Sequence, residues 1–187
     1  MVSLHYKLTK EDYTNFYTYV MWDAGYLRKK RAKNILKQLV IVSVFIGILY
    51  FSGVFKYLSS ITLTIILLMF ATSVIPLFTG RSSANKEAEQ IIDDPDNHAI
   101  FAETLLQTGD DGVHIKTDNA ENKYSWKAII KKTETDSYYF LFINAIQAII
   151  IPKRVFGNNN EKAEFQKLLL RNLSLEAEIK DEINAGE

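Results

Sequence analysis

The sequence predicts an α+β membrane protein: a hairpin of two transmembrane helices, followed by a cytoplasmic antiparallel β domain with a C-terminal helix. Two long uncharged runs separated by a single lysine indicate the hairpin. After Gly80 the composition turns polar, and short β-prone segments follow one another closely, which favours antiparallel pairing. Near the end of the chain, apolar side chains recur at helical spacing.

The formal net charge of zero is a cancellation between the two ends of the chain. Residues 1–37 carry a net charge of +5, residues 38–79 contain one charged side chain, Lys56, and residues 80–187 carry −6. There is no cysteine, which excludes disulfides, thiolate metal sites and a catalytic cysteine. The first apolar run begins near Leu39, too late for a secretory signal peptide.

The two apolar runs are Leu39–Phe55 and Tyr57–Phe78. A helix rises about 1.5 Å per residue, so about 20 residues cross a hydrocarbon core of roughly 30 Å. The second run is long enough alone, and the first becomes so if it starts at Ile35. The alternative, a buried hairpin in a soluble core, predicts a polar stripe that neither run has. One continuous helix through both runs would be about twice as long as the bilayer is thick, so the chain must turn near Gly53 or Ser59–Ser60.

Basic residues flank the hairpin and predict its orientation. Two of them, Arg81 and Lys86, follow the second run, and Lys56 alone marks the turn. The positive-inside rule therefore places both termini on the cytoplasmic side of the membrane. The basic run before the first helix is also expected to contact anionic lipid head groups at the membrane interface: Arg28, Lys29, Lys30, Arg31 and Lys33, with Lys37 beyond it.

The apolar runs contain no Asp, Glu, Arg or His. Intramembrane ionisable residues usually mark ion or proton pathways, so their absence favours an anchor over a transporter or channel. Ser43 and Gly47 lie four residues apart and predict close approach of the second helix. An oligomeric pore stays open as an alternative, lined by Ser43, Ser52, Thr62, Thr64 and Ser73.

The N-terminal arm, residues 1–34, predicts a strand and a helix. Ser3–Leu8 alternates in polarity, and Thr9 with Asp12 three residues later forms a variant capping box, so a helix follows from Lys10. That helix has an aromatic face that suits either a membrane interface or packing against the soluble domain: Tyr13, Phe16, Tyr17 and Val20, widened by Tyr19, Met21, Trp22 and Tyr26. The hairpin then takes residues 35–79 and the cytoplasmic domain residues 80–187.

The cytoplasmic domain is predicted to start with a short helix, Asn85–Ile92, capped by Ser82 or Ser83. A last helix from about Asn160 to Asn184 presents Phe165, Leu168, Leu169 and Asn172 on one face. Between them lie six strand-like segments joined by tight links such as Gly109–Gly112 and Asn144–Ile146: Phe101–Thr108, Val113–Thr117, Lys123–Trp126, Lys127–Thr135, Ser137–Ile143 and Gln147–Ile151.

Six strands, or seven with the N-terminal one, and a C-terminal helix suit a bent sheet or open barrel plugged by a helix. That is the pleckstrin-homology (PH) plan, although the count alone does not single it out. The chain also resembles the YcxB-like family of bacterial membrane proteins, and this resemblance implies a PH-like domain with no established enzyme activity. The matching pieces, in order with two transmembrane helices, are Tyr6–Tyr13, Asp111–Val113, Tyr124–Ile129, Tyr138–Ile143 and, most specifically, Gln147–Phe156.

Lys153 and Arg154 are the first candidate site, because Pro152 ends a strand and two basic side chains then project at its edge. They suit a phosphate or a partner's carboxylate. The structural alternative is that they hydrogen-bond nearby carbonyls or pair with Glu161 and Glu164. Trp126 and Phe156 are expected in the core, with ligand stacking as the alternative.

A second candidate is a basic face toward the bilayer, for which a solvated surface is the alternative. It comprises Lys116, Lys123, Lys127, Lys131 and Lys132, of which Lys127 and Lys131 are candidate partner contacts. Asp93, Asp94, Asp96 and His98 offer ligands for a divalent cation, but turn chemistry explains this segment as well.

No nucleophile motif, glycine-rich phosphate loop or framed carboxylate pair occurs. We therefore expect no enzyme activity and no cofactor, and the acidic domain argues against nucleic acid. The leading hypothesis is a membrane-anchored interaction module that binds a lipid or an unidentified protein partner, with a homo-oligomer left open. The alternative is an immunity or envelope-stress protein that protects the membrane against a peptide toxin.

Overall fold

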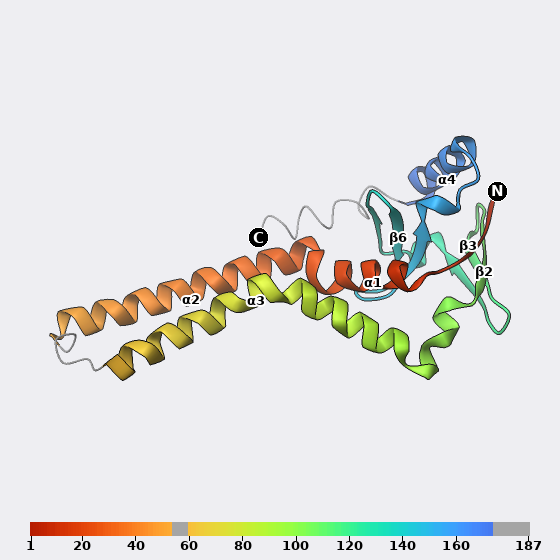
Figure 1. Ribbon diagram of the computed structural model, residues 1–187. Coiled ribbons are helices and arrows are strands. Elements are labelled where there is room, and N and C mark those ends of the chain that lie inside the picture. Colours follow the sequence, from red (N-terminus) through yellow and green to blue (C-terminus); the bar gives the residue numbers. More distant parts are fainter. Residues whose placement is uncertain (54–59, 174–187) are drawn as a thin grey trace.

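The computed structural model describes residues 1–53 and 60–173 (Figure 1). Two long helices lie side by side and extend away from an α+β domain. The chain begins in that domain with β1 (Val2–Lys7) and α1 (Lys10–Thr18), passes through a π-helical turn (Tyr19–Asp23), and leaves along α2 (Gly25–Phe51). It returns along α3 (Ser60–Asp93), so the helix pair is an insertion within the domain's own sequence.

The domain contains two antiparallel sheets with neighbour orders β1-β2-β3-β4 and β5-β6-β7. A 3-10 helix (Pro95–Phe101) leads from α3 into β2, and α4 follows β7 through a short 3-10 turn. The α+β class with antiparallel strands and a C-terminal helix is therefore confirmed. The strands and the last helix are β2 (Glu103–Thr108), β3 (Gly112–Lys116), β4 (Glu121–Ser125), β5 (Lys131–Glu134), β6 (Tyr138–Phe142), β7 (Ala148–Pro152) and α4 (Asn159–Asn172).

The N-terminal strand joins the sheet formed by the later part of the chain. β1 pairs with β2 from Val2 opposite Thr108 to Lys7 opposite Glu103. The Tyr6 hydroxyl donates to the Ile150 carbonyl oxygen at 2.8 Å and so links the first sheet to β7 of the second. Residues 1–24 are consequently part of the domain, and a unit that begins at residue 80 lacks an edge strand.

The main core lies between the two sheets and α4. Alternation places the odd-numbered side chains of β6 and β7 on this side, so Tyr139, Leu141 and Ile151 are fully buried. Phe165 and Leu169 of α4 close the core from above, as the position of the helix in Figure 1 shows. Trp126 belongs to this core, and Phe156 packs against it, as expected from the sequence.

Helix α1 covers the opposite face of the three-stranded sheet. Phe16 and Val20 pack on Tyr138, Phe140 and Phe142, whose side chains alternate with those in the main core. The Phe16 and Phe140 ring centroids are 5.4 Å apart in an edge-on arrangement, which favours aromatic pairs. Of the two alternatives for the aromatic face of α1, packing against the soluble domain is therefore the correct one for these residues.

Both long helices continue past the boundaries that composition suggests. α2 already begins at Gly25, ahead of the basic run, and α3 runs without a break through Gly80 to Asp93. The prediction of a separate helix capped by Ser82 or Ser83 is wrong, because no residue there interrupts the helical hydrogen bonding of α3. The limits 34/35 and 79/80 thus lie inside helices, and no linker separates the helix pair from the domain.

An interlocked contact joins the two helices where they enter the domain. The Trp22 indole ring packs directly over Gly80 of α3, in space that a β-carbon would need. The Arg31 guanidinium lies 3.7 Å from the centre of that ring and donates to the Trp22 carbonyl oxygen at 2.7 Å. Arg81 and Asp23 approach to 3.4 Å beside it. We call these five residues the collar.

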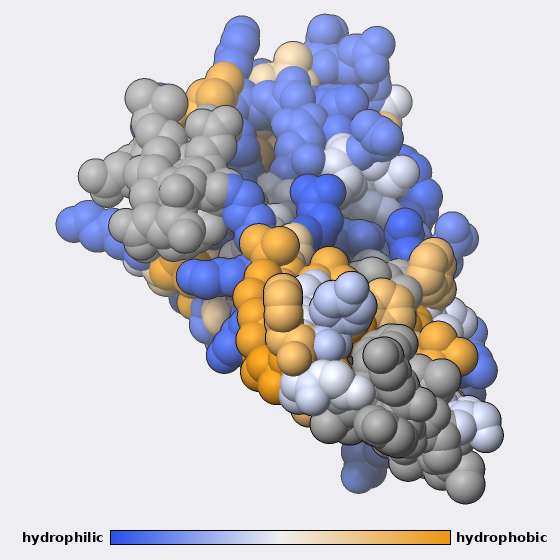
Figure 2. All heavy atoms as spheres, turned by 90° about the vertical axis from the view of Figure 1, so that its left-hand side faces the viewer, coloured by the Kyte–Doolittle hydropathy of each residue, from blue (hydrophilic) through white to orange (hydrophobic). Residues whose placement is uncertain are grey.

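The far part of the helix pair is apolar and exposed. Within the described residues, one helical run, Lys10–Phe51, contains an apolar stretch long enough to cross a membrane, and none of that stretch is buried in the fold. Exposed apolar side chains of α3 include Leu67, Leu68 and Phe78. Figure 2 shows apolar side chains gathered on the helix pair, with the hydrophilic surface of the domain behind.

Several predicted element ends shift in the structure. The segment Lys127–Thr135 starts with a 3-10 turn (Trp126–Ala128) instead of a strand, because Trp126 turns inward and donates its indole N–H to the Gly109 carbonyl oxygen at 2.9 Å. Gly53 follows α2 with a φ of 73°, a conformation that suits glycine, and this agrees with a turn there. Lys56, Ser59 and the end of the predicted last helix, up to Asn184, lie outside the described residues.

We predict that Gly80→Ala destabilises the protein by about 1–3 kcal/mol, because the new methyl group overlaps the Trp22 ring, which Arg31 holds in place by stacking on it. Gly47→Ala is the matched control, since a β-carbon at Gly47 meets nothing within 4 Å. Thermal unfolding of the full chain in detergent measures both effects. Equal melting temperatures for the two variants would contradict this account of the collar.

Candidate functional site

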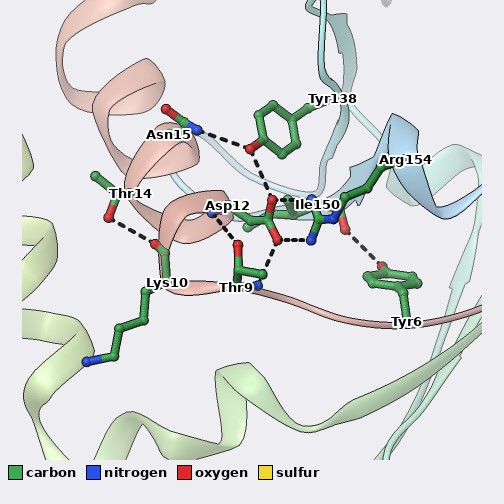
Figure 3. Close-up of polar contacts among 9 residues, drawn as sticks. All are labelled: Tyr6, Thr9, Lys10, Asp12, Thr14, Asn15, Tyr138, Ile150 and Arg154. Atoms are coloured by element: carbon green, nitrogen blue, oxygen red, sulfur yellow. Dashed lines mark hydrogen bonds and ion pairs between the residues drawn. The ribbon is translucent and has the colours of Figure 1, made fainter.

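The most completely built polar site surrounds the carboxylate of Asp12, whose residue surface is only 1% exposed (Figure 3). Asp12 is the third residue of α1, so the predicted capping box is confirmed. Its backbone N–H donates to the Thr9 hydroxyl at 3.2 Å, and its carboxylate accepts from the Thr9 backbone N–H at 2.7 Å. This arrangement satisfies amide groups that the start of a helix otherwise leaves unpaired.

Arg154 binds the same carboxylate with two parallel hydrogen bonds. Its Nη1 donates to Oδ1 and its Nη2 to Oδ2, both at 2.5 Å. The Tyr138 hydroxyl also donates to Oδ1, at 3.0 Å, and in turn accepts from the Asn15 side-chain amide at 3.0 Å. A bidentate guanidinium–carboxylate pair is among the strongest polar contacts in proteins, and here it joins α1 to the end of β7.

The charges of this cluster are balanced. Burial alone would raise the pKa of Asp12, but the hydrogen bonds from Arg154, Thr9 and Tyr138 outweigh burial and hold the pKa below its ordinary value. The same contact raises the pKa of Arg154 further. Burial and the neighbouring Asp12 charge raise the pKa of Tyr6, so that phenol stays protonated. Asp12 is therefore an ionised structural group and no proton donor.

Lys153 is also paired within the fold. Its ammonium donates to Glu134 Oε1 at 2.7 Å and lies 4.8 Å from the centre of the Tyr139 ring. Burial would raise the pKa of Glu134, yet Lys153 lowers it below its ordinary value. Burial and Glu134 raise the pKa of Tyr139 to about 12. Lys153 thereby connects the β5–β6 hairpin to the end of β7.

The expected partners of the two basic residues were wrong. Glu161, proposed as one of them, instead accepts from the Gly157 backbone N–H at 2.8 Å at the start of α4. Asp12 and Glu134 take that place, at sequence separations of 142 and 19. No local pattern indicates the Asp12–Arg154 pair, because its members meet only when α1 lies on the second sheet.

The five lysines of the predicted basic face lie on different parts of the domain. Lys116 and Lys123 are in the first sheet, where Lys123 approaches Glu121 to 3.4 Å. Lys127 is in the 3-10 turn, and Lys131 and Lys132 are in β5 of the second sheet. The Lys131 ammonium lies 5.1 Å from the Phe142 ring centre. A single basic face is not formed by all five, and the roles of Lys127 and Lys131 stay predictions.

The acidic segment after α3 is explained by turn chemistry. The Asp93 carboxylate pairs with Lys10 at 2.8 Å, and the Asp94 carboxylate caps the following 3-10 helix by accepting from the Asp96 N–H at 3.0 Å. Among the described residues, no group of three or more potential metal ligands comes together. The alternative of a cation site here has no geometric support.

The basic run on α2 divides into two groups. Arg28, Lys29, Lys30 and Lys33 are exposed, whereas Arg31 turns back onto Trp22 in the collar. The sequence alone did not separate Arg31 from its neighbours. Trp22 and Arg31 are nine positions apart in the sequence. Their contact forms only because the π-helical turn folds the indole ring back along α2.

A cavity of about 640 Å³ lies between the β2–β3 turn and α4. Several of its polar groups pair with one another: His114 Nε2 lies 2.9 Å from Asp111, and Arg171 pairs with Asp110. Among the described residues that line the cavity there is no serine, threonine or cysteine that could act as a nucleophile.

Together these features define an α+β protein with two antiparallel sheets, a C-terminal helix and a long apolar helix that extends from the domain. A family model described as YcxB-like protein matches residues 109–169, from the β2–β3 turn into α4, so this part of the chain is similar to the YcxB-like family. The resemblance inferred from the sequence is confirmed. Comparisons with curated proteins and with solved structures find no match.

We predict that Arg154→Met destabilises the protein by at least about 2 kcal/mol, because it leaves the Asp12 carboxylate buried without its counter-charge. The matched control is Arg171→Met, which removes an exposed ion pair worth about 0–1 kcal/mol. Denaturant or thermal unfolding in detergent measures both. A loss of stability of the same size for the two variants would show that the burial of Asp12 does not affect the cost of removing its arginine partner.

The lowered pKa of Asp12 also predicts a pH dependence. The native state binds this proton less readily than the unfolded chain, so its stabilisation is present above a pH of about 4 and is lost as the pH falls through the lowered pKa. Asp12→Asn should remove that component of the acid sensitivity while it lowers stability at pH 7. Melting temperatures between pH 3 and pH 7 provide the measurement. Parallel curves for the two proteins would exclude this role.

Proposed function

We propose that this protein is a non-enzymatic, membrane-anchored interaction module at the cytoplasmic face of a bacterial inner membrane. In this proposal α2 and α3 cross the bilayer as a hairpin and both termini are cytoplasmic. The α+β domain is PH-like and binds a protein or lipid partner. The observation that carries the proposal is the exposed apolar surface of the helix pair, which enters a packed domain without a linker.

Exposed apolar side chains support the anchor. Ile41, Val44 and Ile48 of α2 each expose more than half of their surface, and Phe51 at its end is 90% exposed. In water each such side chain costs roughly 1.5–3 kcal/mol relative to burial, so a surface of this kind is favourable only in contact with lipid or another apolar partner. Apolar residues of α3 add to it from the neighbouring helix.

The distribution of charge supports the orientation. Lys29, Lys30 and Lys33 are exposed on α2 at the end nearest the domain, and Arg81, inside α3, lies beside Asp23 just before α2 begins. Trp22 and Arg31 lie at the same level, and tryptophan and arginine are typical of membrane–water interfaces. The collar would then mark the cytoplasmic surface of the bilayer.

The architecture supports a PH-like module mounted rigidly on its anchor. Seven antiparallel strands in sheets of four and three, with α4 against the core, agree with that plan. The helix pair departs between β1 and β2, and α1 is fixed by Asp12 and Arg154. Such a rigid connection would hold one surface of the domain at a constant distance from the membrane, where a partner could bind it.

A surface suited to a protein partner lies at one end of the second sheet. Ile130 and Ile146 are 44% and 59% exposed, and both lie near the Phe142 end of β6. Lys127 precedes Ile130 by three residues and is exposed. Exposed apolar residues beside a cation are common in protein-binding surfaces, so these three residues are the proposed contact.

The test uses the full chain, since a fragment from residue 80 lacks β1 and α1. We expect it to stay in the membrane pellet after alkaline carbonate extraction. Reporter fusions at both termini should be cytoplasmic. Photo-crosslinkers at Ile130 and Ile146 should capture a partner that one at Leu170, 67% exposed on α4, does not. Release by carbonate would contradict the anchor, and equal capture at all three positions would contradict the surface.

A further inference from the structure

We propose that a small cavity beside the collar binds the head group of an aminophospholipid, with the phosphate at Arg81 and the primary ammonium at Asp136. The inference rests on the proposed membrane anchor and names the lipid that the domain would recognise. The ligand class is a zwitterion that carries a phosphate and a primary ammonium a few bonds apart.

The cavity has a volume of about 220 Å³ and is lined by residues of α1, the π-helical turn, α3, the β5–β6 turn and β6. At about 30 Å³ per water molecule it has room for about seven water-sized groups, which suits a head group but not a whole lipid. The residues that the argument uses are Tyr19 and Asp23 of the π-helical turn, Arg81 of α3, and Asp136 and Ser137 of the β5–β6 turn.

The cavity adjoins the end of the apolar surface. Phe78, 81% exposed, precedes Arg81 by three residues on the same helix, so both lie on the same side of α3. Gly80, between them, packs against Trp22 of the collar. A lipid whose acyl chains lie along the apolar part of α3 would therefore bring its phosphate to Arg81.

Arg81 has the capacity to bind that phosphate. Its side chain is 65% exposed and its one ion pair among the described residues, with Asp23 Oδ2, is long at 3.4 Å. A guanidinium has five N–H donors, so most stay available for phosphate oxygens. The Ser137 hydroxyl lines the same cavity and, within the described residues, makes no hydrogen bond.

Asp136 supplies the opposite charge. Among the residues that the structure describes, its carboxylate makes no hydrogen bond or ion pair, although it lines a cavity. The Tyr19 side chain forms an aromatic wall nearby, and aromatic faces attract ammonium groups. The cavity thus offers a guanidinium for the phosphate and a carboxylate for the ammonium of an aminophospholipid, and the apolar part of α3 adjoins it.

The floor of the cavity is fixed by the Asp12 cluster. Asn15 and Tyr138 line it and are hydrogen-bonded to each other at 3.0 Å, and Tyr138 donates onward to Asp12. These groups are already satisfied and are held in place by Arg154. This side of the cavity is therefore preformed, so ligand binding would not carry the entropy cost of ordering these side chains.

The experiment measures which lipids stay with the full chain when it is purified in detergent from an equimolar mixture of phosphatidylethanolamine, phosphatidylcholine and phosphatidylglycerol with identical acyl chains. We expect at least tenfold retention of phosphatidylethanolamine over phosphatidylcholine, because trimethylation removes the ammonium donors. Arg81→Gln should lower the retention of both lipids, because both carry the phosphate, and Asp136→Asn should abolish that preference. Lys29→Gln, an exposed charge on α2 outside the cavity, is the matched control and should retain it.

Melting temperatures in the same detergent identify variants that fail to fold, and Ser137→Ala then provides a milder test, with an expected severalfold loss. Equal retention of the ethanolamine and choline lipids, or an unchanged preference in folded Asp136→Asn, would overturn the proposal. Tighter binding of soluble phosphoethanolamine than of the lipid would overturn the assignment to a membrane lipid. A protein that carbonate releases from membranes contradicts the anchor itself, whereas an inserted protein without lipid preference contradicts only this inference.

Discussion

The contact between Asp12 and Arg154 connects the N-terminal helix α1 to the turn that follows β7, the last strand. Asp12 starts α1, which leads through the π-helical turn into α2, and Arg154 follows β7 at the end of the second sheet. Because the carboxylate is buried and receives four hydrogen bonds, α1 has one position on that sheet. The aromatic layer of Phe16 on Phe140, the route of α2 and the floor of the small cavity all depend on that position.

The collar extends this constraint to the helix pair. Trp22 can lie on α3 only where the opposing residue has no side chain, and Gly80 provides that place. Arg31 then stacks on the indole ring. The result is a domain whose orientation relative to its apolar helices is set by packed contacts at the start of α2 and inside α3, without a flexible connection.

Local patterns in the sequence predicted the local structure well. The capping box of Thr9 and Asp12, the strand before it and the strands that become β6 and β7 follow from spacing and residue type. Interactions between distant residues were not predictable in this way. The partner of Arg154 is 142 residues away, and Arg31 looks like any other residue of its basic run. The continuity of α3 through Gly80 was missed because a change in composition resembles a helix end.

The pairing of β1 with β2 has a consequence for how the protein is made. Val2 and Thr108 are neighbours in the sheet but lie 106 positions apart in the sequence, and α2 and α3 account for 27 and 34 of the residues between them. During synthesis β1 therefore leaves the ribosome well before its partner strand exists, and the sheet cannot close until both helices have been translated. A chain that stops before β2 would therefore expose Leu4 and Tyr6, which are buried in the complete fold, to quality-control proteases.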